Sequence, residues 1–384
     1  MRHHNSVFHG VLKQVPWSLF DTLVEKHKAD HRVRRLSSKS QFLALLFGQL
    51  AGALSLREIE AGLESHAGQL YHLGGRCVAR STLADANASR SWALYGELFA
   101  HMAARTGRPT RRHLGDAVRI LDATRIELSS LSAGWLSAVK GHRAVKLHIA
   151  YDPATATPMR AQLSDQRVND ITPAKHMPIT PGMTYVFDMA YYDFAWWAKL
   201  DARGCRFVTR LKANTVLKVT AEQAVPQTGG VLSDRIGTLP QRIARSRINP
   251  LADPLREITV RIGSGKTIRV LTNDLDAPAC EIADLYKQRW QIELFFKWIK
   301  QNLNIARFLG TSENAVRIQI FVALIAYLLV RSAHASQSTV KRPRTFITLV
   351  RLNLMHKRPI NALKTPPPRP KSDPRQLFMN LEET

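Results

Sequence analysis

The chain has 384 residues, 45% of them hydrophobic, which is enough for two or three domains with a sizeable buried core. This composition excludes a disordered or collagen-like chain over most of the length. Lysine and arginine total 55 against 30 acidic residues, so the formal net charge is +25 and the pI is about 10.5. The three cysteines, Cys77, Cys205 and Cys280, lie far apart and exclude a disulfide framework and a cysteine-based zinc site.

The positive charge limits the class of partner. Nucleic acid is the commonest partner of such a basic chain, and an anionic membrane surface is the second. The basic residues are spread along the chain, with local clusters at 32–35 and 341–344. Spread charge suits a long groove that follows phosphates, although a basic surface without catalysis fits the charge equally well.

No segment is expected to span a membrane. The most apolar stretch, Ile318–Val330, has about thirteen residues, whereas a bilayer helix needs roughly 20. We therefore expect a buried core helix there. The first residues lack the apolar region and cleavage site of a signal peptide, so we expect a cytoplasmic protein without a membrane partner.

Residues 1–112 are expected to form a helical N-terminal domain. Phe42, Leu45, Leu46 and Leu50 recur at helical spacing. Ser55 and Glu58 have the spacing of a capping box, which marks the start of another helix. A further helix is expected from about 81, beyond the glycine turn at 74–75. These helices fit a helix-turn-helix DNA reader, and they fit a packed helical bundle as well.

Residues from 116 onward follow an α/β pattern with a mixed sheet. Expected strands are 118–121, 145–151, 159–163, 184–187, 206–211, 216–219, 256–262 and 268–271, and helices are expected at 194–203 and 280–335. The pattern divides the chain into an α/β domain at 116–213 and 272–335, with a β-rich insertion at 214–271. A basic, proline-rich tail at 336–384 is expected to be extended from about 340.

Two aspartates have a notable position. Asp122 and Asp188 each directly follow an expected buried strand. A carboxylate there is costly unless it is paired or binds a metal ion. Each aspartate alone is more simply a loop cap, but two in equivalent positions make a shared metal site a competing interpretation.

The segment 286–300 carries the strongest signal. On a helix of about 100° per residue, Tyr286, Arg289, Glu293, Lys297 and Lys300 fall within about 80° of arc. Apolar residues, among them Trp290, Leu294, Phe295, Trp298 and Ile299, occupy much of the remaining surface. This pattern predicts a helix buried on most sides whose narrow polar face lines a cleft. An ordinary stripe of i,i+4 ion pairs around Glu293 is the simpler alternative.

Four of these polar residues resemble a known family signature. Tyr286, Arg289, Glu293 and Lys300 match the spacing Y-x2-R-x3-E-x6-K of the DDE transposases of bacterial insertion sequences, in the large IS-four group. The segments 122–124 (DAT) and 188–193 (DMAYYD) are similar to the first and second aspartate motifs of that family. Met189 and Ala190 depart from the second motif, but the acid is kept. The resemblance covers roughly residues 5–335.

The resemblance implies a ribonuclease-H-like core in which Asp122, Asp188 and Glu293 converge as catalytic residues and metal ligands. It implies two Mg²⁺ ions, or Mn²⁺ in their place, which promote phosphodiester hydrolysis and transfer of the 3′-OH to target DNA. The implied partners are the double-stranded terminal inverted repeats of the element and the target DNA, bound by a homodimer.

Six cationic or aromatic residues are candidates for DNA binding. The resemblance assigns phosphate contacts to Arg289 and Lys300 and a hydrogen bond to Tyr286, while Lys297 shares their face as a weaker contact. Arg210 and Lys212 end an expected strand and are DNA contacts or a solvated edge. Two alternatives to a transposase stay open. One is a silent relic that only binds DNA, and the other is a nuclease of the same fold without strand transfer.

Overall fold

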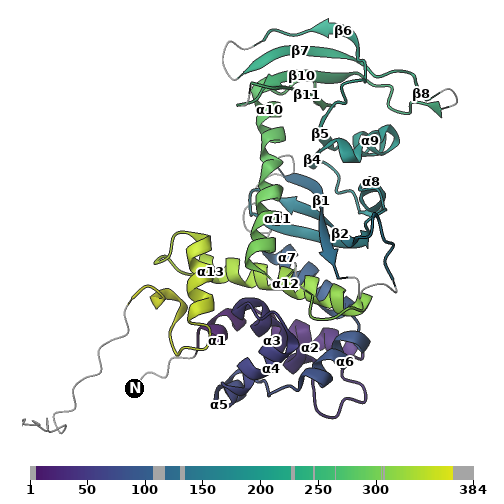
Figure 1. Cartoon of the computed structure of the whole chain (residues 1–384). Helices are drawn as coiled ribbons and strands as arrows, with labels where there is room; N and C mark the ends of the chain where they lie inside the picture. The colour runs from purple at the N-terminus through teal and green to yellow at the C-terminus, as the bar shows by residue number, and fades with distance from the viewer. Residues whose placement is uncertain are drawn as a thin grey trace, which may run out of the picture.

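The computed structural model describes residues 6–106, 117–129, 135–225, 230–244, 247–263, 265–303, 305 and 308–365. The described residues form a helical region followed by one large sheet that has helices on both faces (Figure 1). This arrangement confirms the expected order of a helical N-terminal region and an α/β core.

The N-terminal region is helical throughout its described part. Its elements are α1 (Val7–Leu12), α2 (Trp17–Lys26), α3 (Ser38–Ala51), α4 (Leu56–Glu64), α5 (Ala67–Leu70), η1 (Tyr71–Leu73), α6 (Arg80–Ser89) and α7 (Ala93–Thr106). The expected cap of α4 is present, because the Ser55 hydroxyl accepts a hydrogen bond from the Glu58 amide at 3.2 Å. The helices on either side of Gly74, α4 and α6, contact each other. Whether they read DNA as a helix-turn-helix stays a prediction.

The sheet has nine strands in the order β3-β2-β1-β4-β5-β11-β10-β7-β6. Its first five strands are β1 (Val118–Leu128), β2 (Arg143–Asp152), β3 (Thr157–Asp165), β4 (Thr184–Phe187) and β5 (Arg206–Arg210). β1, β2 and β3 pair in antiparallel fashion, whereas β4 pairs in parallel with both β1 and β5. This order and these directions are those of the expected ribonuclease-H-like core.

The β-rich segment extends this sheet at the β5 edge. It supplies β6 (Lys218–Glu222), β7 (Val231–Thr238), β10 (Leu255–Arg261) and β11 (Thr267–Thr272), while β8 (Arg242–Ala244) and β9 (Arg247–Ile248) form a separate hairpin. β11 pairs antiparallel with β5, so core and extension share one hydrogen-bonded sheet. The strand β7 has no counterpart among the sequence-based expectations.

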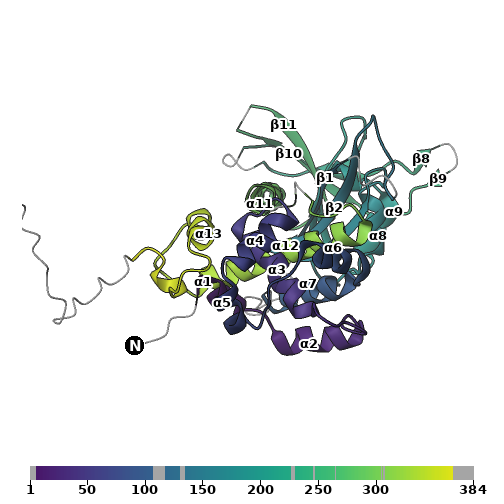
Figure 2. The same ribbon diagram turned by 60° about the horizontal axis from the view of Figure 1, so that its bottom comes forward.

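Helices cover both faces of the sheet. α10 (Ala279–Gln288) and α11 (Trp290–Asn302) run nearly end to end along one face, and α8 (Ile171–His176) and α9 (Phe194–Asp201) lie on the other (Figures 1 and 2). α10 contacts β4, β5 and the strands of the extension, and α11 contacts β1. The long rod formed by α10 and α11 therefore passes the point where β1 and β4 lie side by side.

The expected core helix is α12 (Glu313–Ala335), which crosses between the sheet and the N-terminal helices (Figure 1). It contacts α1, α3, α6 and α7 below the sheet and β3 and α11 above it. Among single helices of the described residues, α12 alone is long and apolar enough to cross a membrane, and 83% of its apolar window is buried inside the protein. Packing against other elements thus accounts for its apolar character. The helices α3 and α4 pass the same test only as a pair bent by 100°.

The C-terminal segment differs from its expectation. Instead of an extended chain from about 340, the structure has α13 (Pro343–Leu352) and η5 (Ile360–Ala362). Phe346, Ile347 and Val350 are buried on one side of α13, which packs on α3 and α12. The apolar residues spaced three and four apart outweigh the basic and proline-rich composition. The run of prolines at 366–368 lies outside the described residues.

Candidate active site

The first predicted acid, Asp122, lies within β1 and does not follow the strand, because β1 continues to Leu128. Its neighbour in the antiparallel ladder is Ile149 of β2. One carboxylate oxygen accepts a hydrogen bond from the Ala123 amide at 2.8 Å, and the side chain is 17% exposed. The carboxylate is therefore held in place at a largely buried position of the central strand.

The second acid, Asp188, directly follows β4, as predicted. It is the N-cap of the short helix η4 (Met189–Tyr191), and its carboxylate accepts a hydrogen bond from the Ala190 amide at 2.8 Å. Because β4 is the parallel neighbour of β1, with Leu121 aligned to Phe187, the residues that follow these two positions are adjacent. The sheet thus brings Asp122 and Asp188 together from distant parts of the chain.

The third acid, Glu293, comes from the rod beside these strands. The predicted single helix over 286–300 is divided, since α10 ends at Gln288 and α11 begins at Trp290. Arg289 joins them with helical dihedral angles, φ −52° and ψ −32°. The Arg289 amide donates to the Tyr286 carbonyl, and the Ile292 amide donates to the Arg289 carbonyl. Both hydrogen bonds span three residues, as in a 3-10 helix, where an α-helix spans four. Arg289, at this junction, reaches Asp122 of β1.

Arg289 connects two of the three acids. Its Nη2 lies 2.5 Å from Glu293 Oε1, and its Nη1 lies 3.5 Å from Asp122 Oδ2. The i,i+4 ion pair considered from the sequence is therefore present, and it extends to a strand residue that the sequence could not place there. The guanidinium also lies 5.9 Å from the ring centre of Tyr286. Arg289, Asp122 and Glu293 thus form one compact charged group.

The electrostatics of this group centre on Asp122. The pKa of Asp122 is raised to about 7, chiefly by burial and also by the negative charges of Asp188 and Glu293, while the Ala123 amide and Arg289 oppose the rise. Burial also raises the pKa of Tyr286. The charge of Asp188 adds to this rise, and the charge of Arg210 opposes it. The site therefore concentrates negative charge in a partly desolvated place, where an added cation would be favourable.

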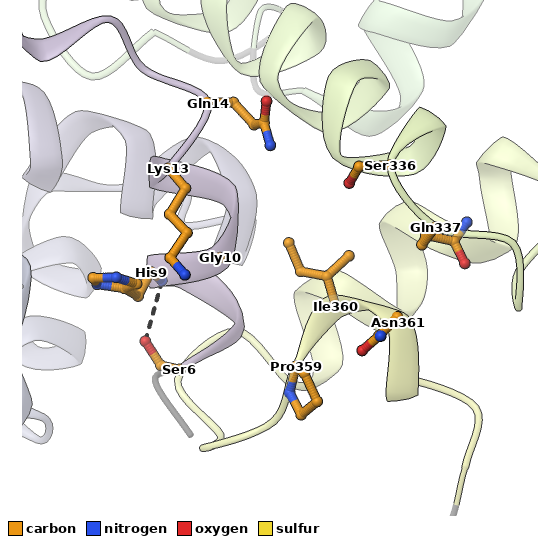
Figure 3. Close-up of a pocket in the computed structure, with 10 residues that line it drawn as sticks. All are labelled: Ser6, His9, Gly10, Lys13, Gln14, Ser336, Gln337, Pro359, Ile360 and Asn361. Carbon is orange, nitrogen blue, oxygen red and sulfur yellow. Dashed lines mark hydrogen bonds between the residues drawn. The ribbon is translucent and has the colours of Figure 1, made fainter. Parts of the chain in front are cut away.

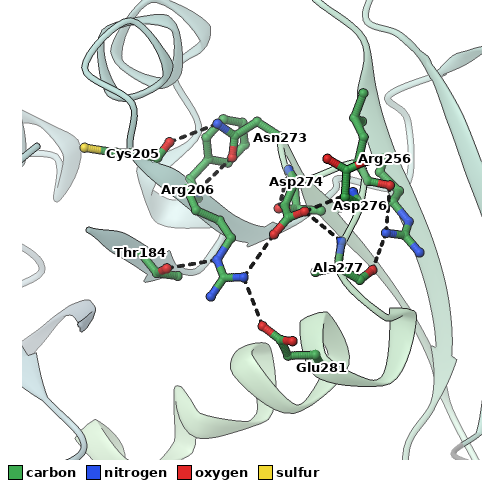
Figure 4. A network of polar contacts seen from close by, with 12 residues as sticks. Thr184, Cys205, Arg206, Arg256, Asn273, Asp274, Asp276, Ala277 and Glu281 are labelled. Atoms are coloured by element: carbon green, nitrogen blue, oxygen red, sulfur yellow. Dashed lines mark hydrogen bonds and ion pairs between the residues drawn. The ribbon is translucent and has the colours of Figure 1, made fainter. Parts of the chain in front are cut away.

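A polar network fixes the start of the rod that carries Glu293 (Figure 4). Asp274, in the loop from β11 to α10, accepts hydrogen bonds from the Asp276 and Ala277 amides at 3.0 and 2.9 Å. Arg206 of β5 bonds to Asp274 and to Glu281 of the first turn of α10, both at 3.0 Å. These contacts anchor α10 to the sheet. Sequence reasoning missed them, although the polar pair Asn273–Asp274 directly after an expected strand is a usable signal.

The other predicted DNA-binding residues come from α11, from the end of β5 and from the residues that follow β5. Lys300 Nζ donates to the Arg125 carbonyl of β1 at 2.9 Å, and burial lowers the pKa of Lys300. Lys297 is exposed on α11 and has no recorded ion pair among the described residues. Arg210 ends β5, and Lys212 Nζ lies 4.4 Å above the Tyr192 ring. Lys300 therefore has a structural contact that the sequence did not predict.

Two apolar residues of α11 differ from their expectation. Trp290 is 59% exposed and Leu294 is 51% exposed, although both were placed on the buried surface of the helix. α11 is covered by β1 on one side and by α12 on another, where Phe295 and Ile299 are buried. Leu294 instead borders an open pocket of about 370 Å³ between α11 and α12. Trp196 and Trp197 are buried against Phe187 on the other face of the sheet.

The donor set fits a hard divalent cation. All three side chains offer carboxylate oxygens, the ligands that Mg²⁺ prefers, and each of the other two acids raises the pKa of Asp122. In the present arrangement no group of three or more His, Cys, Asp or Glu side chains within the described ranges is close enough to hold an ion. The guanidinium of Arg289 supplies the positive charge between Asp122 and Glu293 instead. An ion bound to Asp122 and Glu293 would compete with Arg289 for their oxygens.

A second pocket, away from the sheet, contains none of the predicted site residues. It has a volume of about 360 Å³ and lies between α1 and η5, at opposite ends of the chain (Figure 3). Its lining is polar, with His9, Lys13 and Gln14 on one side and Gln337 and Asn361 on the other. It provides no carboxylate, so the acids of β1, β4 and α11 remain the candidate catalytic centre.

Comparison with known proteins identifies what this site resembles. Residues 113–329, which contain all three acids, match the family model described as "Transposase DDE domain", and residues 3–76 match a domain of unknown function. The chain is 40% identical over 301 residues to "Putative transposase y4zB" of Sinorhizobium fredii, which covers 77% of this chain and 84% of that protein.

Two further similarities were found. The chain is 33% identical over 239 residues to "Probable transposase for insertion sequence element IS5377" of Geobacillus stearothermophilus, 61% of this chain and 62% of that protein. A solved structure of the piggyBac transposase synaptic complex with hairpin DNA aligns with 96% of this chain and 84% of that one, at 10% identity and a TM-score of 0.44.

Proposed function

The chain belongs to the DDE transposases of insertion sequences, and from this premise we propose that it binds the ends of its element, cleaves them and joins the 3′-OH ends to target DNA. The observation that carries the proposal is the convergence of Asp122, Asp188 and Glu293. They come from β1, the end of β4 and α11, and their charges act on one another. Three carboxylates brought together in a basic protein form a site for catalysis on a polyanion.

The three acids are proposed to hold divalent cations, Mg²⁺ or Mn²⁺. Such ions would activate the attacking water or 3′-OH and neutralise the oxygen that leaves the phosphate. The hydrogen bonds from the Ala123 and Ala190 amides orient the carboxylates of Asp122 and Asp188 before any ion binds. The network around Arg206 and Asp274 anchors the start of α10 to β5. Since α10 leads into α11, this anchor also helps to position Glu293 along the sheet.

Arg289 has two proposed positions. In the absence of metal and DNA it neutralises Asp122 and Glu293. When those carboxylates coordinate an ion, the guanidinium is released and can bind a phosphate next to the scissile bond with two parallel hydrogen bonds. Tyr286, Arg210 and Lys300 are proposed as further contacts to the DNA backbone, and the exposed Lys297 and Lys212 as weaker ones.

Joining two ends of one element requires that both ends be held together. We therefore propose a homodimer on DNA, with each copy providing one set of acids. The substrates are the terminal inverted repeats and the target duplex, and the reaction takes place where the chromosomal DNA lies, in the cytoplasm.

The test is cleavage of a duplex that carries the flanking inverted repeat, with Mg²⁺ or with EDTA, by the wild type and by Asp188→Asn. We expect nicking at the end of the repeat that needs Mg²⁺ and is lost in the variant. Tight repeat-specific binding without cleavage would instead support a DNA-binding relic. Cleavage without joining to a second duplex would support a nuclease of the same fold.

A further inference from the structure

A cluster of exposed cations lies in the N-terminal region, outside the candidate catalytic centre. We define the basic loop as residues 27–37, which connect α2 and α3. Lys28, Arg32, Arg34 and Arg35 of this loop are all exposed. Within the part of the chain that the structure describes, no ion pair or hydrogen bond of these four side chains is recorded. The loop thus presents four positive charges over eight residues.

The acid of the loop does not neutralise these charges. Asp30 Oδ1 accepts hydrogen bonds from the Ser38 amide at 2.7 Å and the Ser38 hydroxyl at 2.8 Å, so this carboxylate is engaged at the first turn of α3. Its nearest recorded cation is Arg90, at 4.0 Å. The contrast with the end of α2 is clear, since Lys26 and His27 both pair with Glu97 there.

The backbone of the basic loop is held in a fixed shape. Lys28 and Arg32 have φ angles of +48° and +59°, a region that favours glycine. The loop keeps these conformations through backbone bonds from the Ala29 amide to the Val24 carbonyl and from the His31 amide to the Lys28 carbonyl. Uncommon backbone angles at side-chain-bearing residues are typical of functional segments.

The end of the loop is fastened to α6. Arg90, which follows α6, donates to the Leu36 carbonyl and to Gln41 Oε1, and Gln41 donates to Asn87. Asn314 of α12 in turn donates to the Asn87 and Arg90 carbonyls. The cations are therefore presented by a loop that is tied to the core helices, so little conformational entropy is lost when they bind a ligand.

A local explanation covers only one of the four cations. Lys28 lies just beyond the C-terminus of α2, where a positive charge interacts favourably with the helix dipole. Arg32, Arg34 and Arg35 lie too far along the chain for this effect, which is confined to the last turn. Three uncompensated arginines next to one another repel, and their exposure indicates a partner with several negative charges.

We propose that the basic loop is a second contact surface for DNA, where Arg32, Arg34 and Arg35 bind backbone phosphates of the element end. The inference rests on the proposed function, which supplies a duplex as the polyanion. Guanidinium groups on phosphates carry no information about base sequence, so the loop adds affinity to any duplex and fixes the protein's position on it.

The experiment measures how binding of the full chain depends on salt. The variant Arg32→Gln/Arg34→Gln/Arg35→Gln is compared with the control Arg160→Gln/Lys199→Gln/Arg203→Gln, which removes the same charge from exposed residues of β3 and the α9 region. Fluorescence anisotropy follows a labelled inverted-repeat duplex and a scrambled duplex over a range of NaCl concentrations. Each lost phosphate contact lowers the slope of log K against log salt by about 0.9. We expect a fall of about 2–3 for both duplexes with the loop variant and of less than about 1 with the control.

An unchanged slope, or equal changes in the two triple variants, would overturn the proposal. A third variant with lysine at the three positions keeps the charge and should restore the slope, which separates lost contacts from a misfolded loop. In parallel, the wild-type protein is tested for cleavage of the inverted-repeat duplex. If cleavage occurs while the loop variant keeps its slope, the loop proposal alone fails. If cleavage is absent while the loop variant still loses slope, the proposed function fails and the surface stands.

Discussion

The guanidinium of Arg289 lies between two carboxylates of the candidate centre, 2.5 Å from Glu293 and 3.5 Å from Asp122. One contact follows the helix and the other crosses to β1, so Arg289 couples the rod to the sheet. A divalent cation at the proposed site would compete with this guanidinium for the same oxygens. The charge state of the free protein therefore depends on a residue that is also a candidate for phosphate binding.

Replacement of Arg289 should strengthen metal binding in the absence of DNA. In Arg289→Gln the two carboxylates lose their competing cation, which for a partly buried pair corresponds to about 1 kcal/mol or about fivefold in affinity. Titration of Mn²⁺ followed by electron paramagnetic resonance measures this without any cleavage. Lys297→Gln, which removes a charge from the same helix without a recorded ion pair in the described residues, should leave the affinity within about twofold. Weaker Mn²⁺ binding by Arg289→Gln would show that the guanidinium organises the carboxylates and does not compete for them.

Glu293→Gln should separate cleavage from binding. The change keeps the shape of the side chain and removes the charge of a proposed metal ligand. Such a ligand is worth several kcal/mol in the transition state, so cleavage should fall by at least ~100-fold. Affinity for the inverted repeat should stay within about twofold, because Glu293 is not a phosphate contact. Glu127→Gln, an exposed position of β1, is the matched control and should cleave normally. A parallel loss of binding in Glu293→Gln would assign Glu293 a structural role.

Asp122 gives the stability of the free protein a pH dependence. The pKa of its carboxyl is raised to about 7 in the folded protein against an ordinary value of 3.8. The folded protein holds the proton more tightly than the unfolded chain. Ionisation of Asp122 therefore does not lower the unfolding free energy below about pH 4, and the full loss is reached once the pH has risen through 7.

Asp122→Asn should remove this loss. Between pH 5 and pH 8 the wild type should lose roughly 2 kcal/mol of unfolding free energy that the variant keeps. Urea unfolding at both pH values, with EDTA present, measures the difference. Asp21→Asn, an exposed position of α2, should show no such gain. An equal pH response of Asp122→Asn and the wild type would mean that the carboxyl titrates normally.

Local patterns were sufficient to predict most of the fold. The strand pattern at 184–187 and the cap at Ser55 are set by neighbouring residues, and the structure has these elements where they were expected. The extent of β1 was not predicted in this way, because the expected strand ended at Leu121, directly before the polar residue Asp122. Pairing with β2 from Ile120 to Leu128 outweighs the weak strand propensity of Asp122.

The site shows the same limit. Helical spacing placed Arg289 and Glu293 on one face, and the ion pair between them follows from that spacing alone. The contact of Arg289 with Asp122 and that of Lys300 with the Arg125 carbonyl join residues more than 160 positions apart. Such contacts depend on the order of strands in the sheet, which periodicity does not encode.

The buried ion pair between Arg256 and Asp234 offers a test of how firmly the β-rich extension holds α10. Arg256 Nη2 lies 2.7 Å from Asp234 Oδ2, with the two side chains 4% and 1% exposed. Arg256 also donates to the Leu275 and Ala277 carbonyls, in the loop that leads into α10. Removing the arginine alone leaves a buried carboxylate and two carbonyls without their donor, so Arg256→Met should cost about 3–5 kcal/mol of unfolding free energy.

The double variant Arg256→Met/Asp234→Leu should recover most of that loss, because neither charge then remains buried. Urea unfolding of the four proteins of this cycle gives the coupling between the two positions. The carbonyls of the β11–α10 loop stay unpaired in the double variant, so we expect its cleavage rate to remain below the wild type even where stability returns. A double variant as unstable as Arg256→Met would show that these carbonyls, and not the buried Asp234, account for the cost.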